Sequence, residues 1–173
     1  MICISTSAQD TPLIFTDVVQ VDSIISKDIL YNRARAWLND VFIDYKEVSQ
    51  IQDKEAGELS VKGIIFTRYL KNGFGTPVSE WPCNVRCKIT IWVKDGRYKF
   101  EFSDYYDRCS SLESSSLGQL TSKEILESRY KWQKKIINEN WNEAKLGATN
   151  KTKELIISLK EAMNKGESDT NNW

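Results

Sequence analysis

The 173-residue sequence contains no histidine. This absence excludes an imidazole base, imidazole metal ligands and any Ser-His or Cys-His nucleophile pair. Neither sign of charge dominates, because basic and acidic residues both total 24, so no net field favours nucleic acid as a partner. No apolar run reaches the roughly 20 residues that span a bilayer. We therefore expect no transmembrane segment, no nucleic-acid partner and no cofactor.

The N-terminal segment is similar to the end of a secretory signal. Thr6 and Ala8 are small residues at the positions that a signal peptidase inspects, and Gln9 would begin the mature chain. Cys3 is a poor lipid-attachment site because a bulky isoleucine precedes it. We expect an exported protein in which residues 1–11 are residual signal peptide; an ordinary disordered N-terminus is the alternative.

Hydrophobic periodicity predicts a strand over residues 13–21 and a helix from Ser26 to Phe42, with Ser26 as its N-cap. The apolar stripe of this helix is expected to pack against Ile89, Ile91 and Phe100, burying Leu30, Trp37, Leu38 and Val41. Residues 45–52 and 58–70 predict a hairpin, although the second strand has apolar residues at both parities and its inward face is left open.

The clearest pattern is the alternation from Val85 to Val93, followed by Asp95-Gly96. This dipeptide favours a two-residue type I′ turn, which fixes the register of the two strands around it. The facing pairs are then Val93–Tyr98, Ile91–Phe100, Ile89–Phe102, Trp92–Lys99 and Thr90–Glu101.

A Ser-rich stretch over residues 110–120 predicts a flexible connector. A helix capped by Thr121 or Ser122 follows, and Gly147 is expected to end or break it before a second helix begins. The tail over residues 166–173 is expected to fray.

The stretch from Ser26 to Leu38, together with the later Lys62-Gly63 step, carries a family resemblance. A helix that opens with an acidic residue, contains Leu-Tyr and Trp-Leu pairs and precedes such a hairpin resembles an exported Gram-negative domain of unknown function with a TATA-binding-protein-like (TBP-like) fold. The resemblance covers roughly residues 15–109. It implies the fold and a location in the periplasm or at the cell surface, but neither an activity nor DNA binding.

These observations predict an α+β protein with the order β-α-β-β-β-β-α, an antiparallel sheet with helices packed on one face, and a C-terminal helical extension. The TBP-like domain is expected over residues 12–147, including the connector at 110–120, followed by a helix and tail over 148–173.

The cysteines do not predict a metal site. Cys83 and Cys87 lack the usual spacing, and with Cys109 they provide no fourth soft ligand. In the hairpin register Cys83 falls opposite Arg108, so a disulfide with Cys109 requires a bulge near Tyr105-Tyr106. Buried free thiols are the alternative.

The carboxylates Glu101, Asp104 and Asp107 invite comparison with the acid pair of a glycoside hydrolase. On a strand, however, these side chains divide between the two faces, and such a cluster is more often a solvated strand end. We therefore assign no catalytic residue.

Aromatic and basic residues form the candidate binding site, which consists of Phe74, Trp81, Arg86, Lys88, Trp92 and Lys99. Residues 71–82 predict a long Gly- and Pro-rich loop, where Phe74 and Trp81 form a recognition surface with Trp92 or instead seal the edge of the core. The expected function is a non-catalytic binding module for an envelope protein or ligand. A carboxylate-based hydrolase and a subunit that homodimerises through its sheet face are the alternatives.

Overall fold

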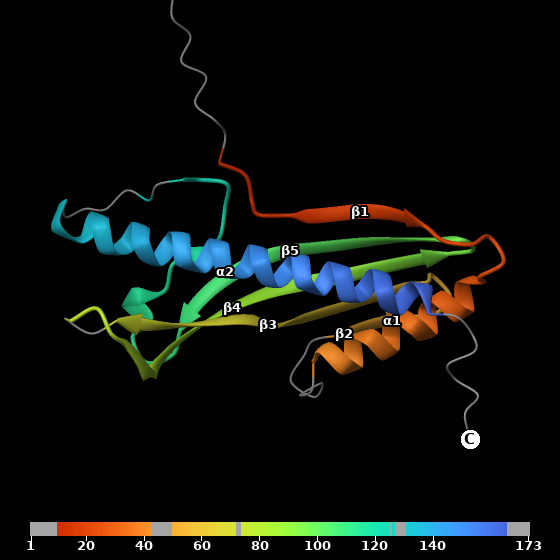
Figure 1. Cartoon of the computed structure of the whole chain (residues 1–173), viewed down its shortest axis with the longest axis horizontal. Helices are drawn as coiled ribbons and strands as arrows, with labels where there is room; N and C mark the ends of the chain where they lie inside the picture. The colour runs from red at the N-terminus through yellow and green to blue at the C-terminus, as the bar shows by residue number, and fades with distance from the viewer. Residues whose placement is uncertain (1–9, 43–49, 72–73, 125, 127–130, 166–173) are drawn as a thin grey trace, which may run out of the picture.

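A computed structural model of the chain describes residues 10–42, 50–71, 74–124, 126 and 131–165. The strands (Figure 1) are β1 (Phe15–Gln20), β2 (Gln50–Asp53), β3 (Glu58–Lys71), β4 (Pro77–Lys94), β5 (Arg97–Cys109) and β6 (Gly118–Gln119). The helices are α1 (Lys27–Val41), α2 (Lys131–Asn164) and a short 3-10 helix, η2 (Glu113–Ser115). Three predicted segments lie wholly or partly outside the described residues: residues 1–9 of the signal remnant predicted at 1–11, the first part of the strand at 45–52, and the tail at 166–173.

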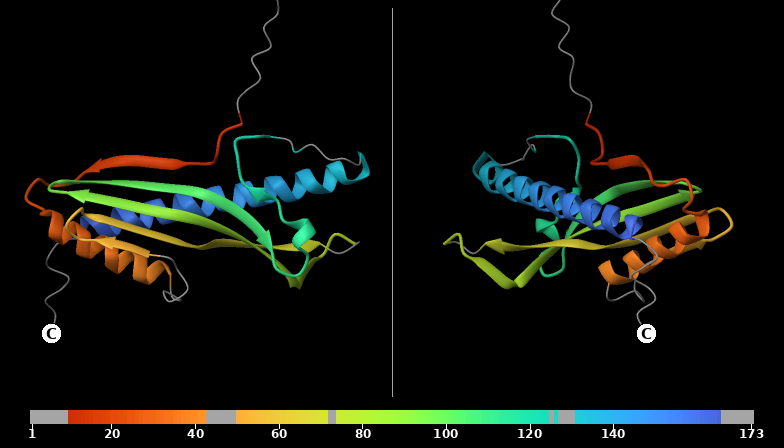
Figure 2. Two further views of the ribbon diagram at one scale, coloured as in Figure 1. Left: turned by 180° about the vertical axis from the view of Figure 1, so that it is seen from behind. Right: turned by 45° about the vertical axis from the view of Figure 1, so that its right-hand side comes forward.

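The strands form one antiparallel sheet in the order β1-β5-β4-β3-β2, with β6 beside β5. Both helices pack on one face of this sheet, which we call the inner face, and they contact each other there (Figure 2). No helix in the described part of the chain covers the opposite, outer face. The predicted α+β class, with an antiparallel sheet and helices on one face, is confirmed.

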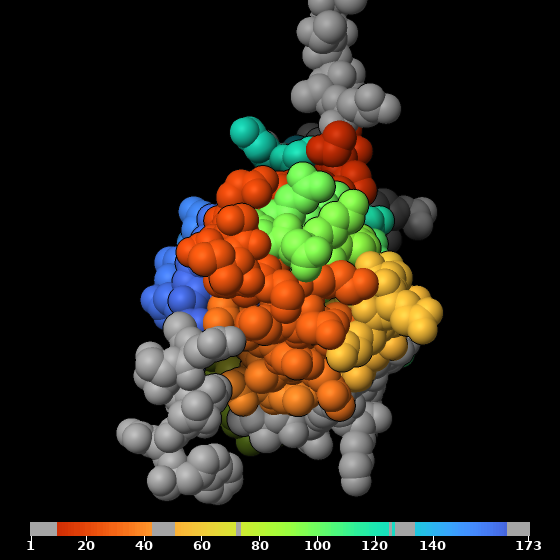
Figure 3. Space-filling view, turned by 90° about the vertical axis from the view of Figure 1, so that its right-hand side faces the viewer, coloured from red at the N-terminus to blue at the C-terminus, as the bar shows by residue number. Residues whose placement is uncertain are grey.

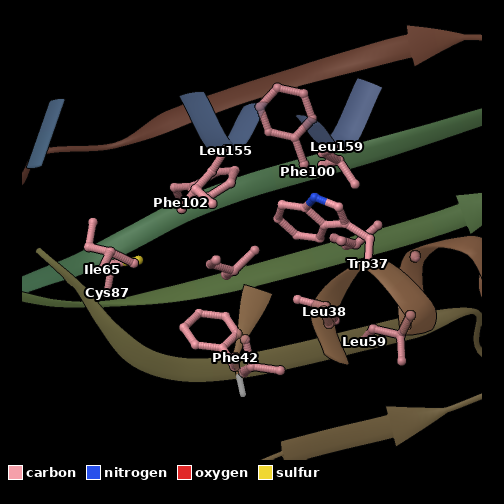
Figure 4. Close-up of a cluster of buried hydrophobic side chains, with 14 of the residues drawn as sticks. Trp37, Leu38, Phe42, Leu59, Ile65, Cys87, Phe100, Phe102, Leu155 and Leu159 are labelled. Carbon is pink, nitrogen blue, oxygen red and sulfur yellow. The ribbon is translucent and has the colours of Figure 1, made fainter. Parts of the chain in front are cut away.

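Helix α1 begins where Ser26 caps it, its Oγ accepting a hydrogen bond from the Ile29 amide at 3.4 Å. As predicted, Leu30, Trp37 and Leu38 are buried in the core with the β4–β5 hairpin, whereas Val41 is only partly buried. Figure 4 shows Trp37 and Leu38 within this cluster. Just beyond the helix, the Phe42 ring occupies the space that a side chain at position 63 would fill, so a glycine is required there.

One end of the molecule is closed by the start of α1 and two hairpin turns (Figure 3). The Lys27 amide donates to the Asp95 carboxylate at 2.7 Å, and Lys27 Nζ donates to the Glu55 carbonyl at 2.7 Å. We call this the turn end of the sheet. The predicted β4–β5 register is confirmed here for every pair, from Val93–Tyr98 to Ile89–Phe102.

Two adjacent bulges change which residues face inward. The β3–β4 pairing shifts between Ile64 and Phe66, and the β4–β5 pairing shifts opposite Asp104, whose φ of 54° lies in the left-handed region. Because side chains alternate between faces, one inserted residue switches the inward positions from odd to even on β3 and from even to odd on β5. Arg68 and Asp107 are thereby placed on the inner face.

Beyond the bulges lies the disulfide end of the sheet. The bulge on β5 places Cys83 directly opposite Cys109, and a disulfide joins them. The Ser-rich stretch, for which composition predicts a flexible connector, follows a defined path over this end and contains η2 and β6. The Ser116 hydroxyl accepts from the Cys109 amide at 2.8 Å, and the Ser111 hydroxyl donates to the Glu80 carbonyl at 2.8 Å. Serine side chains therefore satisfy backbone groups in this irregular segment.

The prediction that Gly147 ends or breaks a helix is wrong, because α2 continues through it. A Cβ at position 147 would overlap the ring of Phe66, so the glycine allows α2 to approach β3 closely. The predicted helix start is also wrong: Thr121 forms an isolated bridge with Pro12, and Ser122 hydrogen-bonds to Thr11.

The loop predicted over residues 71–82 is too long, because β4 begins at Pro77, which pairs with Lys71. A proline is tolerated as the first residue of a strand, where no ladder N–H is required. A second register shift, between Tyr69 and Lys71, accommodates the additional residues of β4.

Candidate functional site

The three aromatic residues predicted to form one recognition surface are not brought together. Phe74 lies at the β3–β4 turn and is 96% exposed, whereas Trp81 packs against Leu70 and the disulfide. Trp92 lies in the same strand as Trp81 but eleven residues further on, which corresponds to about 36 Å along an extended strand. Trp81 thus has the core-sealing position that the alternative interpretation assigned to it.

The other predicted binding residues share the outer face. Arg86, Lys88 and Trp92 alternate along β4, and Lys99 pairs with Trp92 from β5. The Lys99 ammonium lies 4.9 Å from the centre of the Trp92 ring and 3.9 Å from a Glu101 oxygen. Trp92 and Lys99 therefore contact each other, and Lys99 also contacts Glu101. Arg86 and Lys88 lie further along the sheet, nearer the middle of the outer face.

Cross-strand pairing arranges the outer side chains in rows. One row joins Lys62 of β3 to Lys88 of β4, and the next joins Ile64, Arg86 and Tyr106 from β3, β4 and β5. Ile64 is the one of these additional residues that the sequence placed beside this face. Lys62 was not identified because alternation left the inward face of β3 open, and Tyr106 was not identified because its outward position depends on the β5 bulge.

The charges in these rows are only partly compensated. Lys62 Nζ lies 3.5 Å from a carboxylate oxygen of Asp104, with both side chains more than half exposed. Within the described part of the chain, no carboxylate lies within 4.0 Å of Arg86 or Lys88. The middle of the outer face therefore carries uncompensated positive charge.

Exposed apolar residues are distributed over the same face. Between Trp92 and Lys88, the outer face is lined by small hydroxyl groups, and the buried Ser60 and Thr90 hydroxyls hydrogen-bond to each other at 3.2 Å. The large apolar side chains exposed on this face are Val18, Ile51, Ile64, Tyr69 and Tyr106. The face thus combines exposed hydrophobic and cationic groups.

The acidic residues considered for catalysis do not converge. Glu101 contacts Lys99 and Asp104 contacts Lys62 on the outer face, whereas Asp107 is buried on the inner face. Acid-base catalysis by a carboxylate pair needs both groups on one substrate, and this arrangement does not provide it.

Asp107 forms a buried ion pair that the sequence analysis did not predict. Arg68 Nε and Nη2 donate to its two carboxylate oxygens at 2.8 and 2.9 Å, and neither side chain is exposed. Arg68 also donates to Asn140 of α2 at 3.3 Å and to the Ser115 carbonyl at 3.4 Å. The ion pair therefore connects β3, β5, α2 and the Ser-rich stretch, which is a structural role.

The ionisable groups with shifted pKa values also belong to the core. Burial raises the pKa of Tyr98 to about 12, and burial raises the pKa of Cys87 and of Tyr105 above their ordinary values. These shifts favour the protonated forms, so none of the three is activated as a nucleophile at neutral pH. Among the described residues, no group of three or more acidic or cysteine side chains is arranged to hold a metal ion.

Residues 15–106 match the family described as a domain of unknown function (DUF4468) with TBP-like fold. The chain belongs to this family. The match spans β1 to most of β5, the segment that contains the outer-face rows. The family description assigns no activity to the TBP-like domain.

Solved structures extend the likeness beyond the matched segment. A TBP-like protein from Parabacteroides distasonis is 16% identical with a TM-score of 0.61, covering 88% of this chain and 92% of its own. A DUF4468 family protein from Bacteroides ovatus is 11% identical with a TM-score of 0.61, covering 90% of this chain and 88% of its own. At these identities the likeness shows the TBP-like fold alone.

A comparison with curated proteins found no match. Among the described residues, no helix is both long and apolar enough to cross a membrane.

Proposed function

We propose that this TBP-like domain is a non-catalytic recognition module that binds a partner through the outer face of its sheet. The observation that carries the proposal is the asymmetry of the sheet. Two helices cover its inner face, whereas the outer face has no helix in the described part of the chain and exposes apolar side chains beside cations. Exposed apolar side chains beside uncompensated cations, on a face that no described helix covers, favour an interaction surface.

The construction of the sheet supports a binding role. The strands beneath the outer face are held from the inner side by the apolar core, the Arg68–Asp107 pair and the disulfide. A surface built on regular, cross-linked strands loses little conformational entropy when a partner binds. The separated carboxylates make the hydrolase alternative less suitable, and homodimerisation remains an outcome of the test below.

We propose an exported location, in the periplasm or at the cell surface of a Gram-negative bacterium. The Cys83–Cys109 disulfide supports this location, because such bonds persist in oxidising compartments and are rare in the cytosol. Alkylation of the protein in intact cells, before and after reduction, measures the state of these cysteines. Fully alkylated cysteines without reduction would argue against export.

Site-specific photocrosslinking tests the recognition face. A photoreactive phenylalanine analogue is placed in the full chain at Ile64 or Tyr106 on the outer face, or at Leu146 on the exposed side of α2 as a control. We expect a discrete adduct from the two outer-face positions and none from position 146. No adduct, or an equal yield from all three positions, would contradict the proposal. An adduct between two copies of the 20.0 kDa chain would favour the self-associating subunit instead.

A further inference from the structure

The positive region of the outer face contains three cations at neighbouring positions. Lys62 and Lys88 lie directly opposite each other on β3 and β4, and Arg86 is the next outward residue of β4. Opposite side chains on one face have Cβ atoms about 5 Å apart, and successive outward residues are about 7 Å apart along a strand. Arg86, Lys88 and Lys62 therefore form one patch, which we call the cationic patch.

The sheet itself does not neutralise the cationic patch. Like charges directly opposite each other destabilise a sheet, and in the described part of the chain one carboxylate, that of Asp104, lies within 4.0 Å of any of the three cations. A carboxylate supplied by another molecule would relieve this repulsion. The guanidinium of Arg86 suits such a group, because its planar donors match the two oxygens of a carboxylate.

The groups around the patch favour a protein over a polyanion such as nucleic acid. Ile64 and Tyr106 flank Arg86 in its own row, and both are about half exposed. Away from the patch, the cations Lys99 and Arg108 have carboxylate partners. A nucleic acid needs a continuous track of positive charge, whereas a protein surface can offer a few carboxylates together with apolar side chains.

Resting on the proposed recognition role, we infer that the partner's matching surface is an acidic polypeptide segment whose carboxylates contact Lys62, Arg86 and Lys88. Its apolar side chains lie against Ile64 and Tyr106. A second copy of this chain stacked patch to patch would place cations against cations, which opposes homodimerisation in that geometry.

A titration of the isotope-labelled full chain tests the inference by NMR. The probes are two synthetic peptides of equal length, one alternating Glu with Val and one alternating Gln with Val. We expect the Glu peptide to shift the amide signals of the Lys62 and Arg86 rows, and the effect to weaken with added salt. Arg86→Gln combined with Lys88→Gln should weaken binding by about tenfold or more. Lys153→Gln, an exposed change on α2, should leave binding unchanged.

Three results would overturn the acidic-partner inference. These are equal binding of the Gln peptide, no signal shift with either peptide, and tighter binding of an oligothymidylate on the same rows. The photocrosslinking experiment separates this inference from the recognition role. If the charge-neutralised variant keeps its adduct from position 64, the outer face is a recognition surface but its partner is not acidic. If the parent protein, with its cationic patch intact, gives no adduct from position 64, the recognition role fails as well.

Discussion

At the turn end of the sheet, the inner face consists almost entirely of apolar side chains, and both α1 and α2 cover it. At the disulfide end, beyond the two bulges, the same face holds the Arg68–Asp107 pair and the Cys83–Cys109 disulfide. Helix α1 has ended by Phe42, so α2 and the Ser-rich stretch form the cover there. With fewer apolar groups to bury, this end depends on a covalent bond and a satisfied ion pair.

The two ends also differ in the hydrogen bonding of a buried tyrosine. Tyr105 at the disulfide end shares a hydrogen bond of 2.7 Å with Thr152 of α2. The Tyr98 hydroxyl at the turn end is buried and has no hydrogen-bond partner in the described part of the chain. Polar groups are thus paired at the disulfide end, whereas the turn end tolerates one unpaired hydroxyl within an apolar environment. Five substitutions or conditions test this contrast.

Replacing Arg68 should have the largest effect. Arg68→Met leaves the Asp107 carboxylate buried without its partner, and we expect a loss of about 3 to 5 kcal/mol in the free energy of unfolding. Urea denaturation followed by tryptophan fluorescence measures it. Adding Asp107→Leu should restore much of the loss, and Lys62→Met, which removes an exposed pair, should change stability by less than about 1 kcal/mol. A near-neutral Arg68→Met would contradict the importance of this pair.

Removing the disulfide should come next. Cys83 and Cys109 are separated by 26 residues, and opening a loop of this size lowers stability by roughly 3 to 4 kcal/mol. The Cys83→Ala, Cys109→Ala double variant should therefore unfold at lower urea than the oxidised protein, and added reductant should bring the parent protein close to it. The variant itself should not respond to reductant. Equal stability of the oxidised protein and the variant would show that the bond does not stabilise this end.

Gly147→Ala probes how closely α2 approaches the disulfide end. Alanine favours a helix over glycine by about 1 kcal/mol, but its methyl group would overlap the Phe66 ring. We expect a net loss of roughly 1 to 3 kcal/mol from overpacking. Phe66→Leu should reduce the cost of Gly147→Ala in a double-mutant cycle, measured by thermal unfolding. A stabilising Gly147→Ala would show that the contact is looser than described.

The tyrosine pair gives a matched comparison between the two ends. Tyr105→Phe leaves the Thr152 hydroxyl buried without a partner, which should lower stability by about 1 to 2 kcal/mol. Tyr98→Phe removes a hydroxyl that has no partner and should be neutral or slightly stabilising. Both are measured by urea denaturation at neutral pH. If the two changes cost the same, hydrogen bonding does not distinguish the ends.

The smallest expected effect is on the free energy of unfolding at high pH. Burial raises the pKa of Tyr98 from 10.0 to about 12, so between these values the unfolded chain loses this proton while the folded chain keeps it. The contribution of Tyr98 is therefore complete below pH 10 and decreases as the pH rises, by up to about 1.4 kcal/mol per pH unit. Stability measured at pH 8 and pH 11 should fall less in Tyr98→Phe than in the parent protein. An identical fall in both would contradict the shift.

The β4–β5 hairpin could be predicted because its register is set locally. Asp95-Gly96 fixes the turn, and strict alternation then pairs Val93 with Tyr98 and places Arg86 and Lys88 on one face. Alternation could not settle the inward face of β3, because a one-residue bulge formed by long-range pairing reverses the face between Ile64 and Arg68. The prediction that Gly147 ends a helix was wrong for a related reason. Intrinsic helix propensity cannot show that a phenylalanine from a distant strand, Phe66, occupies the space beside this glycine.

The paired bulges also determine how this sheet can serve as a scaffold for selecting new binders. A library confined to the outer face must vary even positions of β3 as far as Ile64 and odd positions from Thr67 onward. On β5 the rule is reversed, with odd positions as far as Ser103 and even positions from Tyr106. A library that kept one alternation along β3 would randomise Arg68, and most of its members would lose the fold before any binding was selected.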